Sequence, residues 1–474
     1  MHENLIAGEW MKGEATPDVN PSDTTDIVGE YAFADAAQTE MAIAAATRAF
    51  PAWSRTTPQQ RFDLLDDVGT RILADRKRLG TLLAREEGKT LPEAIGEVVR
   101  AGNIFKFFAG EALRPQGEIV PSVRPGITCE TTREPLGVVG LITPWNFPIA
   151  IPAWKIAPAL AFGNTVVFKP AELVPGSAHA LAQILRDAGV PAGVFNLVMG
   201  RGSVVGAALV ASRDVAAVSF TGSVATGSVL GAQAMAAGKR IQLEMGGKNP
   251  LVVLDDANLD VAVAAAINGA FFSTGQRCTA SSRLVVTRGI HDRFVEAMQK
   301  KMATLKVGDA LEEGIDIGPV VDARQLAQDE RYIALAREEG CTVVGGERLE
   351  RARKGFYLAP ALLLGARNTM VSAREEIFGP VASVIEAADD DEALAIANDT
   401  PFGLAAGVCT TSLARTARFK RELQSGLVMV NLPTAGIDYH VAFGGRKASS
   451  HGPREQGTHA RDFYTVVKTA YIQP

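Results

Sequence analysis

From residue 137 onward, short runs of β-branched and apolar residues alternate with segments of helical periodicity. The predicted strands cover residues 138–142, 165–168, 194–198, 217–220 and 240–243. Helices are expected between them, for example over residues 178–188 and 203–211. Because strands that alternate with helices form parallel sheets covered on both faces, this pattern predicts an α/β fold. Ligand-binding groups in such a fold lie at the carboxyl ends of the strands.

A second cycle of the same pattern follows. Residues 251–254 are a predicted strand and residues 259–271 a predicted helix, which leads directly to Cys278. Ahead of both cycles, residues 34–95 have helical periodicity with a break at Thr57 and Pro58. At 474 residues, the chain is long enough for two or three domains, each with its own core.

The composition excludes several classes of protein. The chain has 48 Lys and Arg against 53 Asp and Glu, a formal charge of −5, which argues against a broadly basic nucleic-acid binder. Its four cysteines, at positions 129, 278, 341 and 409, are too scattered for a disulfide framework or a CxxC metal site. We therefore expect no metal centre and a reducing, cytoplasmic setting.

Two segments are candidates for membrane or export signals. The N-terminal residues 1–13 carry Glu3 and Glu9 and have no apolar run, which is not the pattern of a signal peptide. Residues 135–154 are uncharged and long enough to span a bilayer, but they contain several prolines, Pro144 and Pro148 among them. We interpret this stretch as a buried strand followed by an irregular loop that lines an interior cleft, and we expect no membrane partner.

Some residues at predicted strand ends could hold a nucleotide. Gly222 and Ser223 follow the strand 217–220 and open a helix, where close backbone approach and the helix N-terminus favour phosphate; a plain strand-to-helix turn is the alternative. Lys169 and Glu172 follow the strand 165–168, where they could bind ribose hydroxyls, with the carboxylate repelling a 2′-phosphate. Two solvated loop charges would look the same in isolation.

Three further residues suggest covalent chemistry. Cys278 follows Arg277, and an adjacent cation can lower a thiol's pKa, although most lone cysteines are inert core residues. Glu244 sits on a glycine-flanked bend after a strand, where a carboxylate can act as a general base or be a plain surface charge. Asn146, in the uncharged stretch, is either a satisfied core amide or a donor to a developing oxyanion.

Together, these residues belong to six motifs that resemble those of the aldehyde dehydrogenase superfamily, in that family's order and across nearly the whole chain. The motifs are residues 141–148 (LITPWNFP), 168–172 (FKPAE), 220–223 (FTGS), 243–250 (LEMGGKNP), 275–278 (GQRC) and 375–381 (EEIFGPV). The resemblance implies an aldehyde dehydrogenase-like α/β fold with three parts. They are a Rossmann-type nucleotide-binding domain (residues 1–121 and 138–245), a second α/β catalytic domain (246–455) and a small β element for oligomerisation (122–137 and 456–474).

The resemblance also implies a reaction. Cys278 would add to an aldehyde carbonyl to form a thiohemiacetal, and the Asn146 amide with the Cys278 backbone N–H would stabilise the oxyanion. Hydride would then leave for a nicotinamide, giving a thioester, and Glu244 would deprotonate the water that hydrolyses it. Transfer to coenzyme A, or a purely structural role for the fold, are alternatives that the presence of Glu244 beside Cys278 and Asn146 disfavours.

Cofactor positions of the family also match. They are Trp145, Lys169, Glu172, Gly222, Ser223, Glu376 and Phe378. By this match Glu376 holds the nicotinamide ribose and Phe378 backs the ring. Glu172 favours NAD electrostatically, and NADP remains possible as a cofactor.

Resemblance to one group within the family narrows the choice of substrate. Residues 431–440 and 452–457 look most like those of dehydrogenases for α-ketoglutaric semialdehyde (2,5-dioxopentanoate). Arg277 would pair with the distal carboxylate of such a substrate, or else be a structural cation. Apolar tunnel walls are expected from Phe147, Trp154 and Phe443. Succinate semialdehyde and broad aliphatic or aromatic aldehydes remain alternatives.

Two further expectations concern the C-terminal part. Ala442 stands where family members usually carry Pro, which predicts a looser loop near the substrate entrance. Residues 127–133 and 463–472 are rich in β-branched or aromatic residues and are predicted to add strands to a neighbouring subunit. We therefore expect a homodimer or homotetramer acting on a small-molecule aldehyde.

Overall fold

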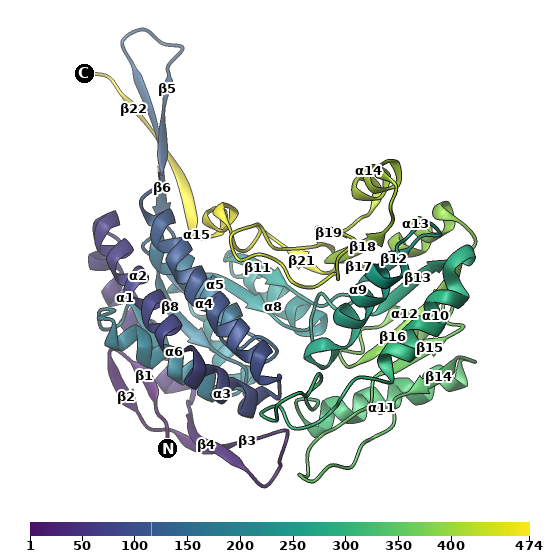
Figure 1. Cartoon of the computed structure of the whole chain (residues 1–474). Coiled ribbons are helices and arrows are strands. Elements are labelled where there is room, and N and C mark those ends of the chain that lie inside the picture. The colour runs from purple at the N-terminus through teal and green to yellow at the C-terminus, as the bar shows by residue number, and fades with distance from the viewer. Residues whose placement is uncertain (115) are drawn as a thin grey trace.

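The predicted alternation of strands and helices is confirmed in the computed structural model, which describes residues 1–114 and 116–474. One sheet has the strand order β2-β1-β9-β8-β7-β10-β11-β21 (Figure 1). Its central strands pair in parallel and are β7 (Val138–Ile142), β8 (Thr165–Lys169), β9 (Phe195–Leu197), β10 (Val215–Thr221) and β11 (Arg240–Glu244). Every residue of β7 and β8 is buried, as expected for strands covered on both faces.

Helices surround this sheet. They are α1 (Ala36–Trp53), α2 (Pro58–Ala74), α3 (Arg76–Glu87), α4 (Leu91–Ala112), α5 (Ala150–Ala161), α6 (Pro175–Asp187), α7 (Ala207–Ala211) and α8 (Val224–Ala236). Among them, α1, α2 and α8 begin at residues whose side chains cap the helix. The predicted break at Thr57 and Pro58 is confirmed, because Thr57 caps α2 through a capping box with Gln60. The edges of the sheet are β1 (Asn4–Ile6), β2 (Glu9–Met11) and β21 (Ser450–His451), and β3 (Glu14–Val19) pairs with β4 (Ile27–Phe33).

The second predicted cycle forms a separate sheet with the order β14-β15-β16-β13-β12-β18-β19. Its strands are β12 (Pro250–Val253), β13 (Arg283–Thr287), β14 (Thr342–Gly345), β15 (Ala361–Leu364), β16 (Val381–Ala387), β18 (Ala405–Cys409) and β19 (Leu427–Val430). The associated helices are α9 (Leu259–Phe271), α10 (Arg288–Met302), α11 (Ala323–Glu338), α12 (Val371–Arg374), α13 (Asp390–Asn398) and α14 (Leu413–Glu422). A short ribbon joins β17 (Phe402–Gly403) to β20 (Arg446–Lys447).

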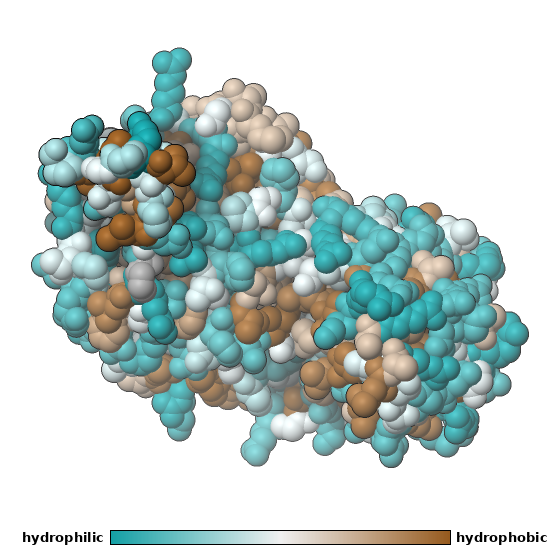
Figure 2. Space-filling model, turned by 90° about the horizontal axis from the view of Figure 1, so that it is seen from above, coloured by the Kyte–Doolittle hydropathy of each residue, from teal (hydrophilic) through white to brown (hydrophobic). Residues whose placement is uncertain are grey.

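A small sheet of β5, β6 and β22 projects from the body of the molecule (Figure 1). β22 (Thr465–Ile472) pairs antiparallel with β6 (Thr128–Pro135) over its whole length, and β5 (Gly117–Pro121) pairs with the other edge of β6. The two predicted strands are thus confirmed, except that residues 463 and 464 belong to α15 (Arg461–Tyr464). Apolar side chains such as Ile119 and Tyr471 are exposed on this sheet, and Figure 2 shows an apolar patch over the projection.

Two strands lie outside the sheets that the predicted domain boundaries would give them. β5 was placed with the nucleotide-binding domain but pairs with β6, and β21 was placed in the catalytic domain but pairs with β11. Strand pairing of distant segments has no local sequence signal, which explains the difference. The division into domains itself stays a prediction.

The uncharged stretch 135–154 is partly as expected. Its first half forms the buried strand β7, but the irregular loop is short because α5 already begins at Ala150. Across the described ranges 1–114 and 116–474, no helix is long and apolar enough to cross a membrane.

Candidate active site

Cys278 lies where two cavities meet. A cavity of about 360 Å³ is lined by residues of α4 and α5 and by the segment 435–437, and a cavity of about 260 Å³ is lined by residues that follow β7, β10 and β11. Cys278 lines both cavities, as does Ile151. A molecule bound in one cavity and a molecule bound in the other would therefore approach the same sulfur.

The segment before Cys278 is held in a strained conformation. Ser273 and Thr274 have φ values of 51° and 56°, in the left-handed region that non-glycine residues rarely adopt. Glu93 of α4 accepts hydrogen bonds of 2.9 Å from both the backbone N–H and the hydroxyl of Ser273, and it pairs with Arg277 at 2.9 Å. These contacts offset the strain and tie the segment that carries Cys278 to α4.

The pKa of the Cys278 thiol is raised, whereas the sequence predicted that Arg277 would lower it. Burial raises the pKa of Cys278 to about 12, and the charges of Glu376 and Glu244 act in the same direction. The predicted lowering by Arg277 is wrong, because the Arg277 guanidinium is directed to Glu93 instead of the thiol. Both carboxylates therefore oppose ionisation of the thiol.

Asn146 lies on a loop held by a buried ion pair. Lys89 Nζ donates to Glu97 at 2.7 Å and to the Asn146 carbonyl at 2.8 Å, and Glu97 accepts from the N–H groups of Ile149 and Ala150. The Asn146 side-chain amide donates to the Gln276 carbonyl at 2.9 Å, two residues before Cys278. An amide group carries two N–H bonds, and one of the two has no acceptor among the described residues, so it can donate to a ligand.

Glu244 is buried at the end of β11. It accepts a hydrogen bond of 2.6 Å from Ser450 Oγ. Burial raises its pKa well above the usual value, as does nearby Glu455, while the Ser450 hydrogen bond and Lys155 oppose the rise. Glu455 is itself paired with Lys155 in the protein interior. Glu244 therefore carries its proton at pH values where an exposed carboxyl would be ionised.

The cavity of about 260 Å³ brings together most of the predicted cofactor residues. Its lining includes Trp145, Gly222, Ser223, Glu376 and Phe378, as well as Asn146. The rings of Trp145 and Phe378 meet edge to face with centroids 5.4 Å apart. Ser223 caps α8 by accepting from the Thr226 N–H, and this helix start directly follows the end of β10.

Glu376 is the charged residue of this cavity. It accepts a hydrogen bond of 2.8 Å from the Gly247 N–H, and burial raises its pKa to about 7. A Cβ atom at Gly246 would lie 2.0 Å from Glu376 Oε2, so only glycine fits beside it. Thr221 Oγ1, in the same lining, is buried with no hydrogen-bond partner in the part of the chain that the structure describes. A close backbone floor with an unsatisfied hydroxyl and a carboxylate fits a nucleotide ribose.

Lys169 is the last residue of β8 and Glu172 follows it by three positions. Neither residue is part of the lining of this cavity. Their charged atoms are 3.9 Å apart. Glu172 also accepts a hydrogen bond of 2.8 Å from the Gly202 N–H, at the start of the π-helical turn Gly202–Gly206. The Glu172 carboxylate is thus oriented by one backbone hydrogen bond, while its side chain is 45% exposed.

Gln325 and Gln328 of α11 were not found from the sequence, yet they line the same cavity. Their side-chain amides donate to the Ile377 carbonyl at 2.9 and 2.8 Å and so support the turn that carries Phe378. Phe378 has a left-handed φ of 66°, which that support helps to maintain. No sequence motif joins α11 to this turn, because the contact arises only from the packing of the helix.

The larger cavity brings together the predicted substrate residues. Phe147, Trp154, Phe443 and Arg277 all line it. The rings of Trp154 and Phe443 are 5.3 Å apart, and Lys89 Nζ lies 3.8 Å from the Phe147 ring centroid. The apolar wall is therefore formed by aromatic rings, as expected from the resemblance.

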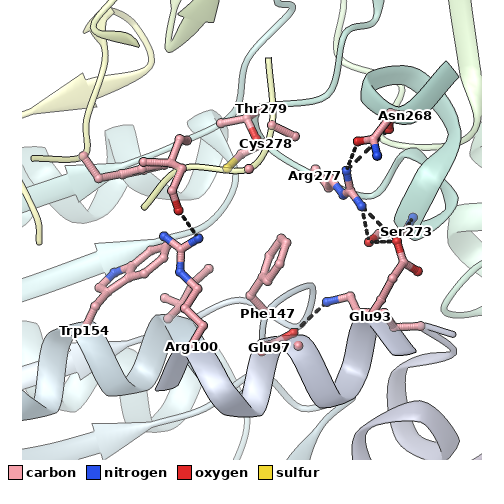
Figure 3. A pocket seen from close by; sticks show the side chains of 17 residues that line it. Glu93, Glu97, Arg100, Phe147, Trp154, Asn268, Ser273, Arg277, Cys278 and Thr279 are labelled. Carbon is pink, nitrogen blue, oxygen red and sulfur yellow. Dashed lines mark hydrogen bonds and ion pairs between the residues drawn. The ribbon is translucent and has the colours of Figure 1, made fainter. Parts of the chain in front are cut away.

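Arg277 has a different partner from the one expected. Its guanidinium pairs with Glu93 and donates to Ser273 Oγ, and Figure 3 shows it turned to that side of the pocket. Because its charge is already compensated, the geometry favours the structural alternative over binding of a substrate carboxylate.

One face of α4 supplies charged residues that the sequence reading missed. Glu93, Glu97 and Arg100 line the larger cavity together with Gly96, and their spacing of three or four residues places them on one side of the helix. Figure 3 shows Arg100 and Trp154 on the side of the pocket opposite Cys278. Charged residues at this spacing in an otherwise apolar helix are the signal that could have found them.

The loop with Ala442 is anchored on its C-terminal side. Phe443 and Glu455 exchange two backbone hydrogen bonds of 2.7 and 2.8 Å. The predicted loosening at Ala442 is therefore limited by the pairing of the next residue, and its effect on substrate affinity stays a prediction.

Comparisons with known proteins agree with this geometry. Residues 10–470 match the aldehyde dehydrogenase family. Alpha-ketoglutaric semialdehyde dehydrogenase from Bacillus subtilis is 44% identical over 99% of this chain and 98% of its own length. The crystal structure of betaine aldehyde dehydrogenase from Staphylococcus aureus in complex with NAD+ has a TM-score of 0.97 and 33% identity, over 100% of this chain and 95% of that one.

A crystal structure described as an E. coli NADP-dependent enzyme is also similar. It has a TM-score of 0.97 and 38% identity, and the match covers 100% of this chain and 98% of that one. These matches extend over the whole chain or nearly the whole chain. The chain belongs to the aldehyde dehydrogenase family and is an oxidoreductase.

Proposed function

We propose that the chain oxidises α-ketoglutaric semialdehyde to α-ketoglutarate, with NAD as the acceptor of hydride. The observation that carries the proposal is that Cys278 is shared by two cavities, one lined by aromatic and charged side chains and one with the features of a nucleotide site. This arrangement suits a reaction in which an aldehyde and a cofactor meet at one nucleophile.

In the first step, the Cys278 sulfur adds to the aldehyde carbon in the cavity of about 360 Å³. The free N–H of the Asn146 amide and the backbone N–H of Cys278 stabilise the resulting oxyanion. Because burial raises the pKa of Cys278 to about 12, the thiol proton has to leave as the C–S bond forms. In this proposal the ionised form of Glu244 accepts that proton and releases it to solvent before the hydrolysis step.

The second half of the reaction needs a base. The nicotinamide, when bound, supplies the acceptor for hydride from the thiohemiacetal carbon, which leaves a thioester on Cys278. Glu244 then takes a proton from the water that attacks the thioester, and the acid is released. Its raised pKa makes the ionised Glu244 a stronger base than an exposed carboxylate.

The cofactor side rests on seven residues. In this proposal Glu376 binds the nicotinamide ribose, and Phe378 and Trp145 border the nicotinamide ring. Gly222 and Ser223 leave room for the pyrophosphate at the start of α8. Lys169 and Glu172 bind the adenosine ribose. Glu172, fixed by the Gly202 N–H, disfavours a 2′-phosphate, so we propose NAD as the main cofactor and NADP as a weaker one.

The substrate proposal is supported by the relative from Bacillus subtilis and by the charged cavity. A relative that is 44% identical over almost the full length and is named for α-ketoglutaric semialdehyde favours the same substrate class here. Succinate semialdehyde is the second candidate, because it has the aldehyde and the carboxylate on a chain that is one carbon shorter and lacks the keto group. The cavity wall formed by the aromatic rings of Phe147, Trp154 and Phe443 can also bind uncharged aldehydes, which we propose as weaker substrates.

We further propose that the projecting sheet of β5, β6 and β22 adds to another copy of the chain to form a homodimer or homotetramer. Exposed apolar side chains on this sheet support the proposal, because large exposed apolar groups on a projecting element mark interfaces. Sedimentation equilibrium of the wild-type chain and of the double variant Ile119→Lys, Tyr471→Lys tests this proposal, and the mass of the wild type distinguishes a dimer from a tetramer. The wild type is expected to sediment as an oligomer and the variant as a smaller species.

The predicted domain boundaries and the cytoplasmic setting are retained as proposals.

Product analysis tests the proposed reaction. Wild-type protein, α-ketoglutaric semialdehyde and NAD are expected to give α-ketoglutarate and NADH in a one-to-one ratio, and Cys278→Ser is expected to give neither. An acyl product that forms only when coenzyme A is added would contradict hydrolysis by Glu244. NADH formation by Cys278→Ser would contradict the role of the thiol.

A further inference from the structure

The cavity of about 360 Å³ contains three cations and two carboxylates. Arg277 pairs with Glu93 at 2.9 Å, and Lys89 pairs with Glu97 at 2.7 Å. Arg100 is the third cation. Over the described ranges 1–114 and 116–474, no carboxylate lies within 4.0 Å of its guanidinium nitrogens.

Neutral groups hold the Arg100 guanidinium in place. One terminal nitrogen donates to the Ile437 carbonyl, and the other donates to Gln456 Oε1 at 3.0 Å. The Nε–H is buried and has no acceptor among the residues that the structure describes. The Trp154 ring lies 5.7 Å from the guanidinium carbon. The side chain is therefore preorganised but retains N–H donors that the protein does not use.

An unpaired, half-buried guanidinium is unfavourable unless an anion compensates it. The carboxylates of Glu97 and Asp438 act on the pKa of Arg100 through their charge, without an ion pair to its guanidinium. Glu97 is already paired with Lys89. Burial lowers the pKa of Arg100, and the charges of Glu97 and Asp438 oppose this change. The cavity thus has one positive charge that the described residues leave without a direct counter-ion.

Arg100 and Cys278 line the same cavity from different elements. Figure 3 shows Arg100 rising from α4 on one side, with Cys278 across the pocket from it. A cavity of about 360 Å³ is at the small end of the range for ligand pockets, roughly 300–1,000 Å³, and suits a short acyclic molecule. An aldehyde carbon at the sulfur would leave the far end of such a molecule within this same cavity.

We propose that Arg100 is the residue that binds the distal carboxylate of the substrate, through its unused N–H donors. The proposal rests on the function proposed above and specifies its substrate class: aldehydes that carry a carboxylate at the opposite end of a short chain. Planar guanidinium and carboxylate groups match in two parallel hydrogen bonds, which selects such aldehydes over neutral ones of equal length. Arg277, whose charge Glu93 compensates, has no part in this recognition.

Three aldehydes with five carbons separate the contributions. The probes are 2,5-dioxopentanoate, 5-oxopentanoate, which lacks the keto group, and pentanal, which lacks both the keto group and the charge. Arg100→Met is expected to raise KM for both acids roughly 10- to 100-fold, because a charge-assisted hydrogen bond is lost. The KM for pentanal and the kcat at saturation are expected to stay near those of the wild type.

The matched control is Lys106→Met on the same helix. Lys106 pairs with Asp66 of α2 at 2.7 Å, outside the cavity lining, so its loss removes a cation of α4 without changing the pocket. The control is expected to retain the KM values of the wild type for all three aldehydes. If Arg100→Met does not fold, Arg100→Lys provides the test, since it keeps the charge but loses the planar pair. A KM rise above the wild-type value that is confined to the two acids is then expected, and an unchanged KM for the two acids overturns the proposal.

Failure of this inference differs from failure of the proposed function. A wild-type enzyme that prefers the acids, together with an Arg100→Met variant that keeps the wild-type KM for them, would overturn the role of Arg100 and leave the function intact. A wild-type enzyme with no preference among the three aldehydes would overturn both the proposed substrate and the carboxylate site. An equal rise of KM for pentanal and the acids would show a general packing role and would also overturn the inference.

Discussion

Lys89 and Glu97 form an ion pair of 2.7 Å whose side chains are each only 1% exposed. The pair connects α4 to the loop before α5, because Lys89 donates to the Asn146 carbonyl and Glu97 accepts from the first N–H groups at the start of α5. The proposed oxyanion donor therefore depends on two charged residues that lie about fifty positions earlier in the chain.

Replacing Glu97 with Gln is expected to lower both stability and activity. Removing one partner of a buried ion pair leaves the other charge uncompensated, which costs roughly 3–5 kcal/mol of the free energy of unfolding. Because Lys89 also holds the Asn146 loop, kcat is expected to fall. Urea unfolding and steady-state NADH formation measure the two effects.

Asp66→Asn is the control for Glu97→Gln. Asp66 pairs with Lys106 at the surface, where both side chains are more than 30% exposed, and an exposed pair contributes about 0–1 kcal/mol. Equal destabilisation by the two variants would contradict the special role given to the Lys89–Glu97 pair.

The pH dependence of cofactor binding is expected to follow Glu376. Burial raises its folded pKa to about 7, so the carboxyl is protonated below that pH and ionised above it. A protonated carboxyl accepts ribose hydroxyl hydrogen bonds poorly, so NAD affinity is expected to weaken as the pH falls from 8 to 6. Fluorescence titration with NAD at each pH measures the effect.

Glu376→Gln removes the titrating group and is expected to flatten this profile. The neighbouring Glu375 accepts a hydrogen bond from the Tyr332 hydroxyl, so Glu375→Gln is the control that keeps the pH dependence. A profile that persists in Glu376→Gln would assign the titration to another group.

The thiol of Cys278 is expected to react slowly near neutral pH in the protein without cofactor. Its pKa of about 12 means that the thiolate fraction, and with it the rate of alkylation by iodoacetamide, rises about tenfold per pH unit between pH 7 and 9. Mass spectrometry of the Cys278 peptide measures the rate. A plateau near pH 8 would show that the thiol is activated in the resting protein, contrary to this account.

Arg277→Met is expected to reduce stability without changing recognition of acidic aldehydes. Removing this guanidinium leaves Glu93 without its ion-pair partner next to the strained Ser273, which is expected to cost roughly 1–3 kcal/mol. Thermal unfolding measures this loss. Arg288→Met, which removes an exposed pair with Glu386, is the control with little expected effect. A selective rise of KM for acidic aldehydes in Arg277→Met would restore the role first predicted for Arg277.

Much of the fold was predictable because its signals are local. Runs of apolar residues such as Val138–Ile142 are buried strands, and Thr57 with Pro58 starts a helix as capping chemistry requires. The residues of the candidate site were also predictable to the extent that they belong to continuous motifs. Cys278, Asn146 and Glu376 meet at one cavity, as the motifs implied.

The remainder depends on contacts between distant segments. Arg100 lies on a helix with no recognised motif, and its position across from Cys278 arises only when α4 packs against the loop 435–437. The direction of Arg277 was wrong for the same reason, since its partner Glu93 is 184 positions away. Burial, which raises the pKa of Cys278, likewise depends on the assembled cavity and has no local sequence signal.

The most direct test of the account compares kcat/KM with NAD for α-ketoglutaric semialdehyde, succinate semialdehyde, pentanal and benzaldehyde in the wild-type enzyme. The account predicts the highest value for α-ketoglutaric semialdehyde, a lower value for succinate semialdehyde and the lowest values for the uncharged aldehydes. Equal or higher values for pentanal or benzaldehyde would contradict recognition of an acidic aldehyde in the cavity that Arg100 and Cys278 share.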